Sequence, residues 1–459
     1  MNIFTKQQIN NSLCPNKKEL SLEPYKLTKE LMTKEKQSSI KSFPGNFWTA
    51  ISMEFLERGA YYGVMSVLGV FLILDPFEGG LGLTKGQAGA ILGTIPPLLY
   101  LLPIIAGAIA DRYGYRKVLF FAFSCMILGY GFTGMANSYF LVFISLLLMA
   151  LGAGFFKPVI SGTIARTTTE SNSGLGFGIF YWSINLGAFL FPLILVPLLK
   201  AESYSYIFYM ASITATVLLL INLFLYKEPQ RVKSNKTLGV VFSEMIMVLK
   251  DWRFILMIFI YSGFWILYFQ MFGTVLWYVK DYLDMTPVNN AVNTFLGLFI
   301  ENPSWKFDVE HVTVINAGVI ILLQLFISAL VKNKPALPTM ITGIGLGTVG
   351  MLILSISATP WVFIIGIMTF TIGEMTTHPK FISYIGLIAP PDKKALYLGY
   401  SFLYGVIGSS IGGFLGSRLY QKYVDELGNP QALWIILSAI GLFSMVSLWL
   451  YNRFIVKKK

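Results

Sequence analysis

EFLERGAYYG, residues 54–63, lies inside an apolar run that extends from residue 47 to residue 74. About 20 helical residues span the hydrocarbon core of a bilayer, so this run is long enough to cross a membrane as one helix. A charged side chain at that depth costs about 2.5–3.5 kcal/mol on insertion scales. Three charged residues in one such segment therefore indicate a function.

The charged residues of this segment share one face of the expected helix. Glu57 and Arg58 follow Glu54 by three and four residues, and Tyr61 and Tyr62 follow Arg58 at the same spacings. Residues three or four apart are neighbours on a helix surface. One carboxylate can neutralise Arg58, and the other is left over as a candidate to carry a proton.

The composition and the apolar segments predict an all-α polytopic membrane protein with 12 transmembrane helices. Of the 459 residues, 55% are hydrophobic and 13% are charged, whereas soluble domains carry about 25% charged residues. Six apolar segments, a basic linker and six more apolar segments match two six-helix bundles. The expected parts are a polar tail (1–44), a first bundle (45–226), a linker (227–252) and a second bundle (253–456). The expected spans are 47–74, 87–110, 117–135, 139–164, 175–199, 205–226, 253–280, 311–331, 337–357, 360–388, 395–421 and 431–455.

The charges of the connecting loops predict the orientation of the chain. Basic residues fall on one side of the expected membrane, and they are Arg112, Arg116, Lys117, Arg166, Lys332, Lys334, Lys393, Lys394 and residues 457–459. The opposite loops are mixed or acidic, with Asp75, Glu78, Asp281, Asp284, Asp308, Asp425 and Glu426. Since cytoplasmic loops carry an excess of Lys and Arg, we expect both termini in the cytoplasm and a multi-pass protein of the plasma (inner) membrane.

Several classes of protein are excluded by the same residues. The net charge of the chain is +12, and its basic residues fall between the apolar runs and at the two chain ends. This distribution favours a membrane topology over a nucleic-acid surface. The two cysteines and two histidines form no metal-ligand spacing, and no phosphate loop or catalytic constellation is visible. We therefore expect no enzyme activity and no cofactor.

Two further segments place polar groups inside apolar runs. Lys157, in Phe156-Lys157-Pro158, lies well inside the fourth segment, where a cation needs an anionic partner or ligand. Asn185, in FYWSINLG (180–187), offers two donors and an acceptor to a polar ligand. An interhelical hydrogen bond is an equal alternative for Asn185.

The three motifs together resemble signatures of the proton-coupled oligopeptide transporters, a branch of the major facilitator superfamily. EFLERGAYYG is similar to ExxER-x-x-YYG, the segment around Lys157 to the family's FKP, and residues 180–187 to FYxxINxG. Residues 107–117 resemble the superfamily loop pattern GxLaDRxGrrk, with Gly107, Asp111, Arg112 and Arg116 as the matching residues. The resemblance covers about residues 47–422 and implies the major facilitator fold.

The resemblance also implies a mechanism and a set of site residues. Arg58 and Lys157 would bind the carboxylate of a di- or tripeptide. Asn185, Asn316 and Glu374 would bind its ammonium group, and Glu374 would otherwise meet Lys157 across the cleft. The expected walls of the cleft are Tyr61, Tyr62, Trp265, Tyr268 and Trp434.

Proton coupling follows from charge balance in the same cleft. An ionised Glu54 or Glu57 holds Arg58, and a protonated one frees Arg58 for the peptide. With Glu374 as a further coupling acid, this gives a proton-driven importer that works as a monomer in the bilayer.

The sequence departs from the family at three positions. Met65 and Phe269 occupy sites where many members carry an Arg and an acid that form a presumed external gate pair. Because both partners are apolar together, no charge is stranded, and we expect the outer closure to rely on apolar packing. Gly59 stands where the family has Phe.

Alternative functions and two local features remain open at this point. The same fold can carry another small anion or an amino-acid conjugate, export drugs, or serve as a non-transporting receptor. His378 can tune a pH response or simply pack in the interior. The apolar patch 291–300 is too short to span a bilayer, and it can lie on the membrane interface or cap the external mouth.

Overall fold

The computed structural model describes residues 40–169, 171–229, 238–390 and 393–456. Most of the expected polar tail and the middle of the expected linker lie outside these residues. The regular secondary structure of the described part of the chain is all helical, with no β-strand. It holds 12 helices that are long and apolar enough to cross a membrane, which confirms the predicted fold class.

The first half of the chain supplies six of these spans. They begin and end within a few residues of the predicted apolar runs because the runs themselves are bounded by polar or turn-forming residues. The fifth span combines two α-helices around a short π-helical segment. The elements are α2 (Gly45–Ile73), α3 (Lys85–Tyr113), α4 (Tyr115–Gly134), α5 (Tyr139–Thr167), α6 (Ser173–Leu190), η3 (Phe191–Leu195), α7 (Val196–Glu202) and α8 (Tyr204–Phe224), with η1 (Ile40–Ser42) and η2 (Pro76–Glu78) outside the spans.

The rest of the described chain consists of a linker helix and a second half that repeats this plan with additional short helices. The elements are α9 (Leu238–Leu249), α10 (Trp252–Phe269), η4 (Gln270–Phe272), α11 (Thr274–Tyr282), α12 (Thr286–Leu296), α13 (His311–Val331), α14 (Ala336–Ile353), α15 (Pro360–Ile388), α16 (Lys394–Ser401), α17 (Leu403–Leu419), η6 (Tyr420–Glu426), α18 (Pro430–Tyr451) and η7 (Asn452–Val456).

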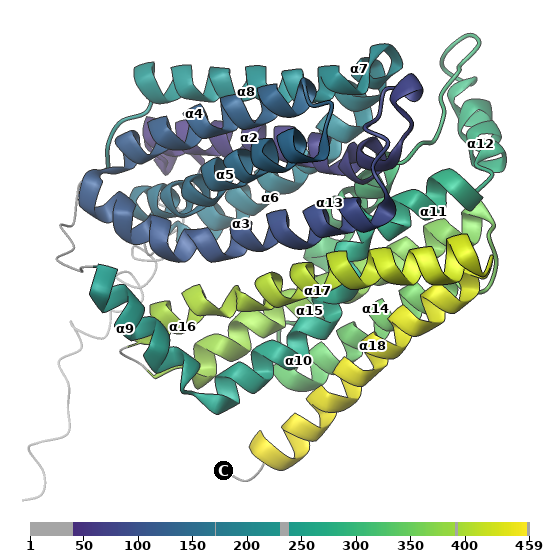
Figure 1. Cartoon of the computed structure of the whole chain (residues 1–459). Coiled ribbons are helices and arrows are strands. Elements are labelled where there is room, and N and C mark those ends of the chain that lie inside the picture. The colour runs from purple at the N-terminus through teal and green to yellow at the C-terminus, as the bar shows by residue number, and fades with distance from the viewer. Residues whose placement is uncertain (1–39, 170, 230–237, 391–392, 457–459) are drawn as a thin grey trace, which may run out of the picture.

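The two halves form two bundles that lie against each other, with most of their long helices running in roughly the same direction (Figure 1). The helix α9, which connects the halves, lies at one end of the bundles beside α16. We call this the linker end, and it also carries Asp111 and Arg166. The opposite end, which carries Lys85, Lys200 and the acidic loops, is called the far end.

Glycines allow the helices around the charged segment to approach closely. A side chain at Gly187 of α6 would place its Cβ 2.5 Å from the Phe55 carbonyl oxygen of α2. At Gly59, the Cβ would lie 2.4 Å from the ring of Phe191, which fills this space from η3. The departure from the family at Gly59 is therefore matched by Phe191, whose aromatic ring takes the available volume.

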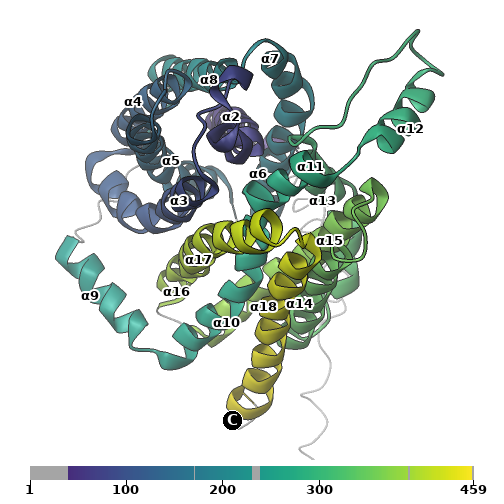
Figure 2. The same ribbon diagram turned by 45° about the vertical axis from the view of Figure 1, so that its right-hand side comes forward.

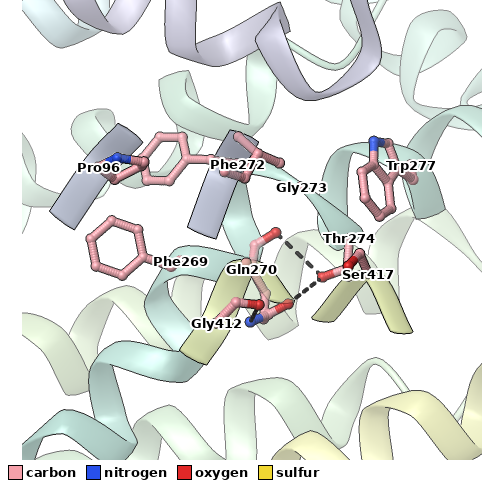
Figure 3. Close-up of a pocket in the computed structure, with 11 residues that line it drawn as sticks. Pro96, Phe269, Gln270, Phe272, Gly273, Thr274, Trp277, Gly412 and Ser417 are labelled. Carbon is pink, nitrogen blue, oxygen red and sulfur yellow. Dashed lines mark hydrogen bonds between the residues drawn. The ribbon is translucent and has the colours of Figure 1, made fainter. Parts of the chain in front are cut away.

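The halves are in direct contact at the far end. A Cβ at Gly413 of α17 would lie 2.3 Å from the backbone nitrogen of Gly93 in α3, so the two backbones touch. Beside this contact, Gln270 donates to the Gly412 carbonyl oxygen and accepts from Thr274 (Figure 3). It also donates to the Ile266 carbonyl oxygen. The Trp277 indole donates at 2.7 Å to the Gly69 carbonyl oxygen of α2. Close backbone packing and the Trp277–Gly69 hydrogen bond thus join the halves at this depth, and the expected role of Met65 and Phe269 in the closure stays a prediction.

Ion pairs between the halves add to this closure nearer the surface. Lys85 of α3 binds Asp281 at 3.2 Å and Asp425 at 2.7 Å. Lys200 of α7 binds Asp308 and Glu310 of the second half, and Lys280 binds Glu78 at 3.5 Å. The expectation that apolar packing closes this end is therefore incomplete, since these ion pairs also join the halves.

The apolar patch 291–300 does not cover the junction between the halves. Figure 2 turns the far end toward the reader and shows α12 beside the second half, outside both bundles. Phe295, Leu298, Phe299 and Ile300 are exposed. Of the two alternatives for this patch, a cap over the external mouth is wrong.

Candidate functional site

Three charged side chains of α2 form a buried cluster in the first half. The Arg58 guanidinium lies 2.5 Å from Glu57 Oε2, and its Nε lies 3.6 Å from Glu54 Oε1. All three side chains are at most 5% exposed, and one oxygen of each carboxylate has no hydrogen-bond partner. Arg58 also lies over the Tyr61 ring, 4.9 Å from its centroid. The cluster therefore contains one cation and two carboxylates, and Glu54 Oε2 and Glu57 Oε1 can each still accept a hydrogen bond.

A cavity of about 670 Å³ lies between the halves next to this cluster. It extends from Glu54, Arg58 and Tyr62 in the middle of α2 to Asp111 and Glu244 at the linker end. The contacts of the far end close the other side of the junction. The structure is thus a conformation that gives access to the cluster from the linker end.

Lys157 lines the same cavity from α5. Its ammonium lies 5.1 Å from the centroid of the Tyr100 ring, and no carboxylate of the described chain is within ion-pair distance of it. A cation over an aromatic face is stabilised without being neutralised. Lys157 is therefore available to an anionic ligand, whereas Arg58 is already paired.

The second half contributes a carboxylate and an amide. Asn316 of α13 donates at 3.0 Å to Glu374 Oε2 of α15 and at 3.0 Å to the Thr371 hydroxyl. Glu374 lies within electrostatic range of Tyr62. The expected meeting of Glu374 and Lys157 across the cleft is not seen, because Glu374 is held by Asn316 within its own half.

Asn185 is not poised as an open donor in this conformation. Its side-chain amide donates at 2.9 Å to the Tyr181 carbonyl oxygen, four residues earlier on the same helix. The sequence left ligand binding and an interhelical hydrogen bond open for Asn185. The observed bond is neither, because both of its partners belong to α6. Its side-chain oxygen keeps acceptor capacity for an ammonium group.

The expected aromatic walls divide into two groups. Of the five, only Tyr62 lines the cavity. Tyr61, Trp265 and Tyr268 are buried behind its surface: the Tyr61 and Tyr62 ring centroids are 5.2 Å apart, and those of Trp265 and Tyr268 are 4.6 Å apart. Trp434 does not belong with them: it is completely buried and packs against Tyr278 inside the second half. Its assignment to the cavity wall is wrong because α18 presents it to the interior of its own bundle.

The loop motif at the linker end binds within the first half. Asp111 accepts at 2.8 Å from Arg166, whose guanidinium lies over the Tyr115 ring, and Asp111 also lines the cavity. Arg116 donates to the Asn222 and Leu223 carbonyl oxygens at the end of α8, while Arg112 is exposed. These contacts fasten the loop to its own bundle.

Only one glycine of this loop is required by its geometry. Gly114 has a φ of 101°, which glycine adopts without strain. A Cβ at Gly107 would meet only the Pro158 side chain at an ordinary 3.7 Å. Gly107 is therefore not required by a close helix contact in this conformation.

Sequence reasoning missed Tyr100, the ring beneath Lys157. Tyr100 also contacts the rings of Trp265 and Phe269, so it joins the two halves beside the cavity. A single tyrosine in an apolar run gave no signal by itself. For His378, the structure supports packing: its Nδ1 lies 3.1 Å from the Tyr261 hydroxyl, and its ring packs against Trp265 and Tyr404.

Residues 55–301 match the family model of the Major Facilitator Superfamily. The di-/tripeptide transporter of Lactococcus lactis subsp. cremoris is 33% identical over 177 residues, which are 37% of this chain and 35% of that protein. The multidrug resistance protein MdtH of Photorhabdus laumondii is 24% identical over 84% of this chain and 91% of its own length. The structure of the peptide transporter POT in complex with sulfate has a TM-score of 0.76 at 19% identity and covers 91% of this chain and 96% of the other.

The family match covers more than half of the chain, and so the chain belongs to the Major Facilitator Superfamily. Within this superfamily it is similar to peptide transporters of the POT family, in agreement with the motifs of its sequence. The matching segment spans only about a third of the length of the peptide-transporter relatives. These relatives and structural neighbours are transporters rather than enzymes.

Proposed function

We propose that the chain is a proton-coupled symporter that imports di- and tripeptides by alternating access of its two halves, residues 45–226 and 253–456. The observation that carries this proposal is the buried cluster of Glu54, Glu57 and Arg58, of which Glu54 and Arg58 line the cavity and Glu57 lies behind them. Two carboxylates for one guanidinium leave one excess negative charge in a buried place. A proton or a rearrangement of Arg58 is needed to balance it.

The proposed cycle uses this charge balance. When Glu54 or Glu57 is protonated, Arg58 loses a partner and can turn to the carboxylate of a peptide, together with Lys157. The ammonium group of the peptide is bound by Glu374 and by the side-chain oxygens of Asn185 and Asn316. When the proton leaves, Arg58 returns to its own carboxylates and the peptide is released.

The orientation proposed for the cycle places the linker end in the cytoplasm. Support comes from the basic residues of that end, which include Arg112, Arg116 and Arg166, and from the acidic loops of the far end. The conformation described above is then open to the cytoplasm and closed to the outside. The large share of the chain outside the peptide-transporter alignments makes the substrate itself part of the proposal.

The test is transport by proteoliposomes with an imposed proton gradient. The wild type should accumulate a labelled dipeptide, and unlabelled di- and tripeptides should compete. Glu54→Gln and Glu57→Gln should each abolish uphill accumulation and retain counterflow exchange, since exchange needs no net proton movement. Glu301→Gln, an exposed acid on the far-end loop, is the matched control and should behave as the wild type. Unchanged uphill uptake in both cavity variants refutes the coupling role.

A second candidate function is drug export, favoured by the similarity to MdtH over 84% of the chain. The two functions differ in direction and substrate. Vesicles that expel a lipophilic cation and ignore dipeptides would support export. Lys157 argues against it, because a cavity cation without a carboxylate partner fits an anionic group of a ligand and repels a cationic one.

A further inference from the structure

A second group of one cation and two carboxylates lies at the far end, outside the cavity. Lys200 Nζ of α7 lies 2.7 Å from Asp308 Oδ2 and 2.5 Å from Glu310 Oε2. Lys200 belongs to the first half, whereas Asp308 and Glu310 precede α13 in the second half. We call these three residues the far-end cluster, and its ion pairs form only while the halves are closed at this end.

The two carboxylates of the far-end cluster differ in their contact with water. The Asp308 side chain is 51% exposed, while that of Glu310 is only 1% exposed. Water can therefore solvate Asp308 in any state of the cluster. Glu310 depends on Lys200 or on a proton, because an uncompensated charge is costly in a buried place.

The other titratable groups near Glu310 do not balance its charge. His311 accepts a hydrogen bond from the Asp308 backbone N–H through Nδ1, and this nitrogen is 4.0 Å from Glu310 Oε1. The same nitrogen lies 3.2 Å from the Asp308 carbonyl oxygen, so its hydrogen-bond partner is the backbone of Asp308 rather than the Glu310 carboxylate. Tyr204 of α8 also lies within electrostatic range of both carboxylates. In the described part of the chain, α2, α6, η3 and α15, which pack against α13, place no cation within ion-pair distance of Glu310.

We propose that Glu310 is a second proton-binding site, separate from the cavity, which takes up a proton when the halves close at the far end. On closure, the Glu310 carboxylate leaves water and accepts a proton from the medium to become a carboxylic acid. Lys200 keeps Asp308 as its counter-ion, and the cluster changes from a net charge of −1 to neutral. On opening, Glu310 returns to water and releases the proton on the same side.

The direction of the pH effect follows from the burial of Glu310 in the closed form. Burial raises the pKa of the Glu310 carboxyl, and Lys200 opposes this rise without cancelling it. Protons therefore bind more tightly to the closed form than to an open form in which Glu310 is solvated. By linkage, acid favours closure of the far end, and rising pH favours its opening.

The Lys85 cluster provides an internal comparison with the same number of charges. Lys85 also binds two carboxylates, Asp281 and Asp425, whose side chains are 33% and 40% exposed. Both carboxylates can be solvated by water while the far end is closed. Closure should therefore take up no proton there, and Asp425→Asn becomes a matched control for Glu310→Gln.

The experiment measures the opening of the far end against pH, without peptide and without a proton gradient. Spin labels at Met135→Cys and Ile356→Cys, two exposed positions at the far ends of opposite halves, report the distance between the halves by pulsed electron resonance in nanodiscs. Cys14 and Cys125 are replaced by Ala beforehand. The pH is varied from about 5 to about 9, equally on both sides.

In the wild type, the ratio of closed to open molecules should fall as the pH rises, and Glu310 should contribute up to tenfold per pH unit. Glu310→Gln, which stays neutral, should remove this part of the slope and keep the far end closed at high pH. Lys200→Gln should move the transition to higher pH, because the ammonium that stabilises the ionised carboxylate is gone. Asp425→Asn should retain the wild-type slope.

The proposal is overturned if Glu310→Gln keeps the full wild-type slope, or if Asp425→Asn loses as much of the slope as Glu310→Gln does. Should Glu310→Gln fail to fold, the direction in which Lys200→Gln moves the transition decides the matter. The proposal rests on the two halves moving apart at the far end and not on peptide transport. Its failure is therefore distinct from a failure of the uptake assay.

Discussion

Replacing Lys157 with Gln should weaken the binding of peptides that carry a free carboxylate and spare those that do not. The side chain lines the cavity, and its ammonium lies over the Tyr100 ring at 5.1 Å with no carboxylate of the described chain in ion-pair contact. A peptide carboxylate would therefore be its first anionic partner. Gln keeps most of the length and the polarity and removes only the charge.

The magnitude follows from the value of a charge-assisted hydrogen bond. Such bonds contribute about 1.5–3 kcal/mol, which corresponds to about a 10- to 150-fold change in affinity. We expect the apparent Kd for a dipeptide to rise within this range in Lys157→Gln. For the same dipeptide with an amidated C-terminus, the wild type and the variant should differ by less than about threefold, since the amide cannot form the ion pair.

The assay is a cycle of two proteins and two peptides, read as competition for binding of a labelled dipeptide to purified protein at one pH. Tyr100→Phe serves as the control, because it keeps the ring beneath Lys157. Its affinities for the free acid and for the amide should both be close to those of the wild type. An equal loss of affinity for the free acid and for the amide would refute the reasoning. Lys157 would then act on the shape or stability of the cavity instead of on the carboxylate.

Two further predictions concern stability, each read from the melting temperature of the purified protein. Gly187→Val should destabilise the folded protein by about 1–3 kcal/mol, because a Cβ there lies 2.5 Å from the Phe55 carbonyl oxygen. The control Gly178→Ala, on the same helix, has open space around its Cβ and should not lower the melting temperature. Equal melting temperatures for the two variants would contradict the close contact at Gly187. Lys380→Met should lower the free energy of unfolding by about 1–3 kcal/mol, because Lys380 donates at 3.1 Å and 2.8 Å to the Lys332 and Lys334 carbonyl oxygens beyond the end of α13. The control is Lys334→Met, which replaces an exposed side chain and should leave the melting temperature unchanged.

The membrane spans could be predicted from the sequence because hydrophobic length is a local property. The spans α13 and α15 begin and end at the expected residues, 311–331 and 360–388. The cluster on α2 was also predictable, since Glu54, Glu57 and Arg58 are neighbours through helix geometry alone. Both successes depend on residues that are close in the chain.

The remaining site contacts depend on packing between distant helices. Glu374 was expected to meet Lys157, but Asn316 of α13 is nearer to it and binds it at 3.0 Å. Trp434 faces its own bundle because α18 packs there, and the sequence of α18 is apolar on several faces. Tyr100 could not be distinguished from other aromatic residues of apolar runs until α5 placed Lys157 above it.

The position of the charges at the far end has a physical reason. Met65 is 2% exposed, so an Arg in its place would have to lose most of its water in the packed interior. With Met65 and Phe269 in these places, that cost disappears, and backbone contacts such as Gly93 with Gly413 can form instead. Lys85 and Lys200 then pair nearer the surface, where at least one carboxylate of each cluster stays in water. Their ion pairs can break at a lower cost, so closure at this end can remain reversible while the interior of the junction stays apolar.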